Sequence, residues 1–186
     1  LRLSVTDRCN LRCAYCMPVH GVRKVDHASI LSFEQTLTAV RAIDHVLPLE
    51  KIRLTGGEPL VRRAVVRLVS MLAGAFPDAQ LCMTTNGVLL ERFARLLREA
   101  GLQRVNVSLD TLDPRKYAAL TRGGDLREVL AGVRAAASVG LTPVRINCVL
   151  LRGINDHEVV DLLRFAVTEG VELRFLELMP VGVAQG

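Results

Sequence analysis

Short runs in which hydrophobic and polar residues alternate recur six times along the chain, and amphipathic helical patterns separate them. Alternation with a period of two predicts a strand with one covered face, whereas apolar residues three and four positions apart predict a helix. The predicted strands are residues 1–6, 51–55, 81–84, 104–109, 144–150 and 171–178. The predicted helices are residues 32–47, 61–75, 88–100, 126–139 and 156–168. Strands that alternate with helices predict a parallel sheet with right-handed crossovers, and hence an α/β fold.

Local signals mark the ends of several predicted helices. Ser32 and Gln35 form the pattern of a capping box, and Asp113-Pro114 is typical of a helix start. Four glycines follow predicted helices, where a left-handed residue is favoured; they are Gly74, Gly101, Gly140 and Gly170.

The polar positions of the strands distinguish a flat, doubly covered sheet from a barrel. A parallel strand that is covered on both faces is a continuous apolar run. Here Val105 and Val107 alternate with Arg104 and Asn106, and the other strands alternate in the same way. Helices cover the apolar face, so the polar face lines a wet interior. Because six strands are fewer than the eight of a closed barrel, we expect an incomplete, laterally open (βα)6 TIM-like barrel, with residues 1–186 as one domain.

The polar face of the predicted strands carries many positive charges. They are Arg2, Lys51, Arg53, Arg145 and Arg174. Cations that line a cavity without matching acids favour an anionic guest, and the guanidinium fork suits phosphate. In the alternative, these side chains reach the rim or pair with Glu58, Glu172 and Glu177. The chain has no Walker-type loop, which argues against ordinary nucleotide hydrolysis.

Three of the five cysteines, Cys9, Cys13 and Cys16, lie within eight residues directly after the first predicted strand. Ferredoxins that transfer electrons usually fill all four iron positions with cysteine, so three ligands predict a cluster with one iron open to a small molecule. A structural zinc site that adds His20 or His27 is the alternative. An odd cysteine count argues against a disulfide framework. The remaining two, Cys82 and Cys148, read as small buried residues.

Composition excludes several classes of function. Half of the 186 residues are hydrophobic, yet no apolar run is long enough for a membrane helix. The net charge of +5 favours an anionic partner, while 4% aromatic residues supply few platforms for stacking nucleic-acid bases. We therefore expect neither a membrane nor a nucleic acid as partner. The chain begins at Leu1 and stops in a loop-like run, so we expect a piece of a longer cytoplasmic protein, with an organellar location left open.

The cysteine motif leads to a family. Cys-x-x-x-Cys-x-x-Cys after a first strand, with Tyr15 before the last cysteine and Gly-Gly-Glu-Pro after the second strand, resembles the radical S-adenosylmethionine (SAM) enzymes. Longer stretches resemble one branch of them, the GTP cyclases that begin molybdenum cofactor synthesis. These stretches are residues 2–18, 51–63, 84–87, 106–110 and 174–180.

The resemblance implies a radical SAM lyase that converts GTP into (8S)-3′,8-cyclo-7,8-dihydroguanosine 5′-triphosphate through a 5′-deoxyadenosyl radical. It implies that Cys9, Cys13 and Cys16 hold a [4Fe-4S] cluster. It assigns SAM contacts to Tyr15, Gly57, Ser108 and Met179. It assigns GTP contacts to Arg2, Arg53, Thr84 and Arg145, with Lys51 and Arg174 as further candidates. It also implies an external electron donor and allows a homodimer.

The chain departs from this family in two ways. Arg145 stands where the family typically has lysine, which keeps the charge but changes the donor geometry. The family's second [4Fe-4S] cluster and arginine-rich tail lie beyond residue 186. We therefore expect this chain alone to bind the first cluster and SAM but to turn over GTP poorly or not at all. Two alternatives remain, namely a radical SAM enzyme with another substrate and a metal-stabilised binding module without catalysis.

Overall fold

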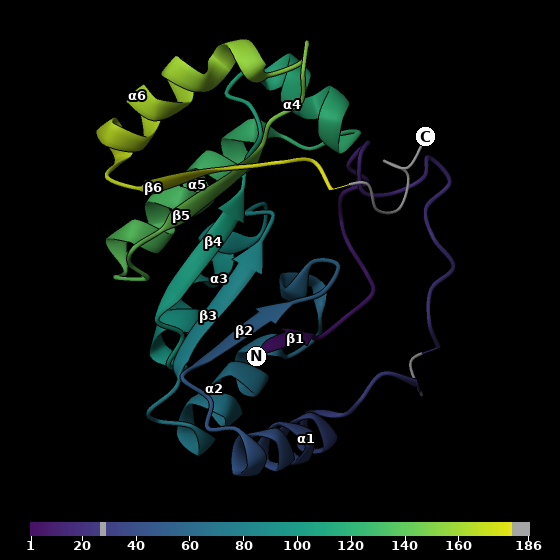
Figure 1. Cartoon of the computed structure of the whole chain (residues 1–186), viewed down its shortest axis with the longest axis vertical. Helices are drawn as coiled ribbons and strands as arrows, with labels where there is room; N and C mark the ends of the chain where they lie inside the picture. The colour runs from purple at the N-terminus through teal and green to yellow at the C-terminus, as the bar shows by residue number, and fades with distance from the viewer. Residues whose placement is uncertain (27–28, 180–186) are drawn as a thin grey trace.

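The computed structural model describes residues 1–26 and 29–179, and its framework is one six-stranded parallel sheet (Figure 1). Its strands are β1 (Arg2–Ser4), β2 (Lys51–Thr55), β3 (Gln80–Thr85), β4 (Arg104–Ser108), β5 (Arg145–Val149) and β6 (Glu172–Leu176). Each strand pairs in parallel with the next one in chain order. Strands β1 and β6 are therefore the two edges, and the sheet is open between them. This is the incomplete, laterally open α/β barrel that the alternation predicts.

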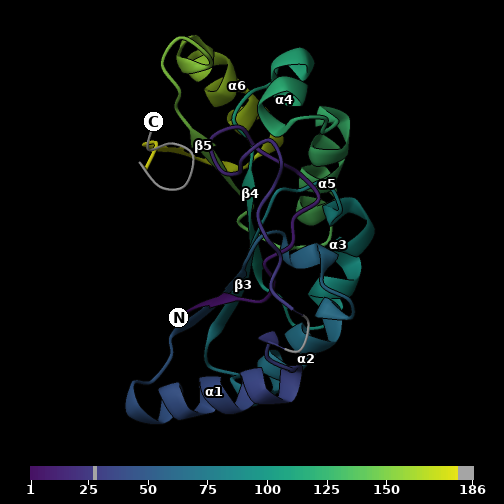
Figure 2. The same cartoon turned by 90° about the vertical axis from the view of Figure 1, so that its right-hand side faces the viewer.

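Helices cover one face of this sheet. They are α1 (Phe33–Val46), α2 (Val65–Ala75), α3 (Leu90–Glu99), α4 (Pro114–Thr121), α5 (Leu126–Ser138) and α6 (Val159–Glu169), with 3-10 turns η2 (Pro59–Val61) and η3 (Asp156–Glu158). Figure 2 shows α2, α3 and α5 on the same side of the strands. The side chains of Leu54, Val105, Val107 and Ile146 point to this side and are fully buried in the core. The apolar half of each alternating strand thus makes the hydrophobic core.

Most helix signals are confirmed. The Ser32 hydroxyl accepts a hydrogen bond from the Gln35 amide at 3.1 Å, and the Gln35 side chain accepts one from the Ser32 amide at 2.8 Å, which completes the capping box. Asp113 caps α4 by accepting from the amides of Arg115 and Lys116. Because Asp113-Pro114 indicated only where this helix starts, the full length of α4 comes from the structure.

Two predictions about α2 are wrong. The helix begins at Val65 rather than at residue 61, because Pro59–Val61 forms a separate 3-10 turn and Ala64 adopts a left-handed conformation with φ of 58°. Gly74 lies inside α2 rather than after it. By contrast, Gly101, Gly140 and Gly170 have positive φ values after their helices, as expected.

The inner face of the sheet is drier than predicted at its centre. Arg104 is only 5% exposed and Asn106 only 1%, so β4 is buried on both faces even though its sequence alternates. Inner-face side chains of the neighbouring strands β3 and β5 lie beside Arg104 and Asn106, and this cover does not depend on the residue pattern of β4 itself. In the part of the chain that the structure describes, no helix is both long and apolar enough to cross a membrane.

Candidate active site

The three clustered cysteines lie on a loop that runs from the end of β1 to the end of α4, as the purple trace in Figure 1 shows. The Arg12 amide donates to the Thr121 carbonyl at 3.2 Å, and the Ala14 amide donates to the Leu120 carbonyl at 2.8 Å. Cys13 starts a tight turn, since its carbonyl accepts from the amides of Cys16 and Met17 at 3.0 Å each. We call residues 7–17 the cysteine loop.

Arg122 also holds the cysteine loop in place. It ends α4 in a left-handed conformation with φ of 56°, and its Nη1 atom donates to the carbonyls of Arg12 at 3.2 Å and Met17 at 2.7 Å. These two acceptors flank Cys13 and Cys16 in sequence. The guanidinium therefore fixes the segment that carries two of the three thiols.

The three thiols are free and close enough to influence one another electrostatically. Burial, followed by the negative charge of Asp110, raises the pKa of Cys13 to about 12, and burial also raises the pKa of Cys9. The Cys9 sulfur accepts from the Leu11 amide at 3.4 Å and from the Asn86 side-chain nitrogen at 3.8 Å. Since metal ligation requires the thiolate, an ion or cluster of positive charge offsets the burial of these sulfurs.

This arrangement suits a cluster better than a single ion. Within residues 1–26 and 29–179, no group of three or more His, Cys, Asp or Glu side chains converges closely enough to hold one metal ion. Cysteine sulfurs on different corners of a cubic cluster are farther apart than those around one zinc ion. The zinc alternative thus finds no support in the described residues, and its candidate His27 lies outside them. Three free thiols with donors aimed at Cys9 fit the [4Fe-4S] group.

The Gly-Gly-Glu segment after β2 packs against the cysteine loop. The Gly57 amide donates to the Thr6 carbonyl and the Glu58 amide to the Arg8 carbonyl, both at 2.7 Å. A Cβ atom at Gly57 would collide with the main chain of Arg8. The missing side chain at Gly57 thus allows close packing against Arg8 of the same chain. The SAM contact that the resemblance assigns to Gly57 stays a prediction.

Glu58 is buried, and within residues 1–26 and 29–179 it forms an ion pair with none of the arginines, contrary to the alternative for those side chains. Its carboxylate accepts from the Thr85 hydroxyl at 2.8 Å, the Asn86 amide at 2.7 Å and the Leu60 amide at 3.0 Å. Burial raises its pKa in spite of these hydrogen bonds. Glu58 therefore ties the loops after β2 and β3 together beneath the thiols.

Tyr15 is held by an acid at the end of β4. Its hydroxyl donates to Asp110 Oδ2 at 2.6 Å, and Asp110 Oδ1 accepts from the Val149 amide at 2.8 Å. Burial raises the pKa of both Tyr15 and Asp110. This pair fixes the aromatic ring at the carboxyl end of the sheet, where parallel barrels place their active sites.

A cavity of about 360 Å³ lies beside these groups. Its lining brings together three predicted site residues, Tyr15, Cys16 and Met179, with Val149 and residues 176–178. Most of the lining side chains are apolar, which suits the adenine and methionine portions of SAM. The structure thus joins the cysteine loop and the segment after β6, which are more than 150 residues apart in sequence.

The inner face of the sheet presents polar side chains in rows. In one row Arg2 is paired with Arg53, and Arg53 with Cys82, which in turn is paired with Arg104. In the next row Thr84 is paired with Asn106, and Asn106 with Arg145. Ser108 and Arg174 flank Asn147 in a third row, and Lys51 lies at the start of β2. The predicted substrate residues therefore share one face.

Only one of the five predicted cations is paired. Arg145 donates from Nε to Glu172, as the pairing alternative expects. In the part of the chain that the structure describes, the ion pairs involve neither Arg2, Lys51, Arg53 nor Arg174. Arg2, Lys51 and Arg174 are exposed, as the alternative of side chains that reach the rim expects, and Arg53 is half-buried. Carboxylates of the described residues therefore offset little of this positive charge.

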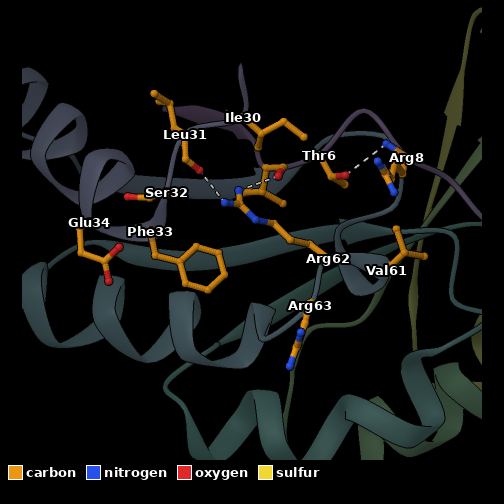
Figure 3. Close-up of a pocket in the computed structure, with 11 residues that line it drawn as sticks. Thr6, Arg8, Ile30, Leu31, Ser32, Phe33, Glu34, Val61, Arg62 and Arg63 are labelled. Atoms are coloured by element: carbon orange, nitrogen blue, oxygen red, sulfur yellow. Dashed lines mark hydrogen bonds between the residues drawn. The ribbon is translucent and has the colours of Figure 1, made fainter. Parts of the chain in front are cut away.

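A larger cavity, of about 600 Å³, lies away from the thiols, between α1 and the loops after β1 and β2 (Figure 3). Arg62 spans it, because its guanidinium donates to the carbonyls of Val5 and Leu31, each at 2.6 Å, and lies 4.5 Å from the Phe33 ring. These contacts connect the start of the cysteine loop with the residues before α1. Arg62 therefore has a structural role, and we place the chemistry at the smaller cavity.

Four residues that organise the site received no role from the sequence: Asn86, Asp110, Arg122 and Arg104. Asn86 and Asp110 lie in polar runs at strand ends, which was a usable signal. Arg104 falls on the polar side of its strand, so the alternation was a usable signal for its place among the inner cations. Nothing in the local pattern distinguishes Arg122 from other helix-end arginines.

Comparison with known proteins agrees with this geometry. The Radical SAM superfamily model matches residues 3–166. The chain belongs to the radical SAM superfamily. The [4Fe-4S] cluster and SAM are the cofactors of this superfamily, and the three thiols and the cavity at Tyr15 fit them.

Similar curated proteins are longer than this chain. A GTP 3′,8-cyclase of Alkaliphilus oremlandii is 46% identical over 184 residues, which cover 99% of this chain and 57% of the relative. One of Peptoclostridium acidaminophilum is 50% identical over 180 residues, which cover 97% of this chain and 55% of the relative. The chain thus spans somewhat more than half the length of these relatives.

Solved structures show the same fold at low identity. Streptococcus suis SuiB, bound to the precursor peptide SuiA, has a TM-score of 0.81 at 17% identity and covers 98% of this chain and 40% of its own. Methylornithine synthase PylB has a TM-score of 0.76 at 17% identity and covers 96% of this chain and 53% of its own. Both are structural evidence for the incomplete barrel.

Proposed function

We propose that this chain is the SAM-binding barrel of a GTP 3′,8-cyclase, the lyase that opens molybdenum cofactor synthesis. The observation that carries the proposal is the set of inner-face cations without ion pairs among the described residues, on the sheet whose carboxyl end carries the cysteine loop and the cavity. A triphosphate is the guest that this charge favours. Relatives at 46% and 50% identity that are named GTP 3′,8-cyclases support the same choice.

In this proposal the chain's residues divide into three groups. Cys9, Cys13 and Cys16 hold the cluster. Tyr15, Gly57, Ser108 and Met179 contact SAM. The phosphates and ribose of GTP are bound by Arg2, Arg53, Thr84 and Arg145, with help from Lys51 and Arg174.

When bound at Cys9, Cys13 and Cys16 and reduced, the cluster would supply, together with SAM, a 5′-deoxyadenosyl radical able to take hydrogen from ribose carbon 3′. The protein's own contribution is placement. Asp110 orients Tyr15 beside the SAM cavity, and the arginine rows hold the triphosphate so that the ribose faces that cavity. Leu176 and Leu178 supply apolar lining to that cavity.

The proposal also includes features outside the described residues. It includes a second [4Fe-4S] cluster in a C-terminal region, an external electron donor and a cytoplasmic location, and it allows a homodimer. The domain assignment of residues 1–186 as one radical SAM core belongs to it as well.

Isotope transfer tests the proposal. We expect the oxygen-free holoprotein of the full-length chain, given a reductant, SAM and GTP deuterated at ribose carbon 3′, to place deuterium in 5′-deoxyadenosine, as mass spectrometry can detect. GTP deuterated at carbon 8 is the matched control and should transfer none. Absence of transfer from the 3′ position, with SAM cleavage intact, would contradict GTP as the substrate and favour another substrate for this radical SAM enzyme. Loss of SAM cleavage altogether, with zinc retained, would favour a binding module.

A further inference from the structure

Two side chains on the inner face of β4 are buried without a hydrogen-bond partner among the described residues. Arg104 is 5% exposed, and both its Nε and its Nη2 atoms lack a partner. Asn106 is 1% exposed, and neither its amide nitrogen nor its oxygen has a partner. Burial of unpaired polar atoms costs free energy, so such atoms are satisfied by ordered water, an ion or a ligand.

The register of the sheet places this pair among the proposed substrate residues. Arg104 shares a row with Arg53 and Arg2, separated from Arg53 only by Cys82. Asn106 lies between Thr84 and Arg145 in the next row. Successive rows on one face of a strand are about 6.5 Å apart. A nucleotide that lies along the strands therefore reaches both residues with different parts of its structure.

The electrostatic surroundings of Arg104 favour an anion. A hydrogen bond from Arg145 lowers the pKa of Glu172, and the nearby positive charges of Arg145, Arg174 and Arg104 lower it further. Three arginines thus act on this carboxylate, and only Arg145 is bonded to it. The remaining positive charge of Arg104 is available to a ligand.

We propose that Arg104 and Asn106 are further substrate-binding residues, with Arg104 contacting the phosphate tail of the nucleotide and Asn106 hydrogen-bonding a sugar hydroxyl. This assignment rests on the proposed function for its choice of nucleotide. The planar guanidinium offers two parallel donors to phosphate oxygens. An amide whose donor and acceptor are both free matches a hydroxyl, which accepts and donates in turn.

The first test compares Arg104→Met with wild type in the oxygen-free holoprotein, with calorimetry as the measurement. We expect the affinity for GTP to fall about 10- to 100-fold, as for the loss of charge-assisted hydrogen bonds, while the affinity for guanosine stays the same. Arg104→Lys keeps the charge but not the fork and should lose less. Arg134→Met is the matched control, because Arg134 pairs with Glu169 on the exposed surface, and it should bind GTP as wild type does.

A merely structural role for Arg104 gives a different result. The variant then loses thermal stability or cluster content but keeps the wild-type ratio of GTP to guanosine affinity. An unchanged ratio in a folded Arg104→Met protein that holds its cluster overturns the assignment of Arg104. An equal loss for guanosine and GTP also overturns it.

The second test concerns Asn106. We expect wild type to bind GTP several-fold more tightly than 2′-deoxyGTP, 3′-deoxyGTP or both, and Asn106→Leu to remove this discrimination. If Asn106→Leu folds, holds its cluster and still discriminates as wild type does, the assignment of Asn106 is wrong.

Inorganic triphosphate separates failure of this inference from failure of the proposed function. If wild type binds triphosphate in a manner that depends on Arg104 but does not prefer GTP to ATP, the anion contact stands and the guanine nucleotide is wrong. If wild type prefers GTP and Arg104→Met keeps the full preference for triphosphate over guanosine, the proposed function stands and the role of Arg104 is refuted.

Discussion

The two faces of the sheet differ in how completely their side chains are satisfied. Neighbouring residues of β2 illustrate this: Leu54 is fully buried against the helices, while Arg53 points to the inner face without an ion pair among the described residues. On β4, Val105 and Val107 pack in the core, whereas Arg104 and Asn106 are buried with unpartnered atoms. The helix-covered face stabilises the fold, and the inner face has polar side chains whose hydrogen-bonding groups are not paired among the described residues.

Removing a cluster ligand should have the largest effect on the inner side. We expect Cys13→Ser to abolish SAM cleavage and to lower the iron content sharply, because the cysteine loop supplies only three thiolates to the cluster and the variant keeps two of them. Iron analysis and detection of 5′-deoxyadenosine check this. Cys148→Ala is the matched control, since Cys148 is a buried cysteine of β5 outside the cysteine loop, and it should retain both properties. Full cleavage by Cys13→Ser would remove the basis for the site.

The second prediction compares substitutions of two adjacent residues whose side chains lie on opposite faces of β2. Leu54→Ala should lower the free energy of unfolding by about 2–5 kcal/mol, as expected for a fully buried leucine. Arg53→Met should leave stability nearly unchanged, because Arg53 has no ion pair among the described residues, while it weakens GTP binding. Urea unfolding and calorimetry measure the two effects. A large stability loss in Arg53→Met would show that the inner face also stabilises the fold.

Glu58→Gln probes the buried carboxylate that joins the loops after β2 and β3. The amide cannot accept from the Thr85 hydroxyl and from the Leu60 and Asn86 amides at once, so we expect a loss of roughly 1–3 kcal/mol. Glu34→Gln, at an exposed carboxylate, is the control and should change stability by less than about 0.5 kcal/mol.

The same residue gives a pH dependence. Burial raises the pKa of Glu58 in the folded protein, so between the ordinary and the raised value the folded state keeps a proton that the unfolded chain has released. Its contribution to stability is therefore present at lower pH and lost as pH rises through that window. Unfolding measured across this range should show a shallower slope in Glu58→Gln. An unchanged slope would mean that Glu58 is ionised without penalty.

The smallest effect is expected at Glu172. Removing its charge with Glu172→Gln frees Arg145 for an anionic ligand, so GTP should bind about two- to five-fold more tightly, in the range of a partly exposed ion pair. Titration of GTP into both proteins measures this. Weaker binding in the variant would show that the pair positions Arg145 rather than competing with the substrate.

The sequence was sufficient for the fold because each strand alternates and each crossover contains a helix. It also located the thiols and the inner cations by pattern alone. It missed features that depend on neighbours distant in the chain. The burial of Arg104 and Asn106 depends on the strands on either side, and the bond between Tyr15 and Asp110 joins residues 95 positions apart. Whether Arg145 pairs with Glu172 depended on register, which alternation leaves open.

The two hydrogen bonds that Arg122 donates to the cysteine loop have a consequence for sequence variation. Its acceptors are main-chain oxygens at Arg12 and Met17, which every amino acid possesses. Side chains at these two positions can therefore be exchanged without loosening the loop, whereas replacement of Arg122 withdraws both bonds at once. Random mutagenesis scored by retained iron should find positions 12 and 17 permissive and position 122 intolerant.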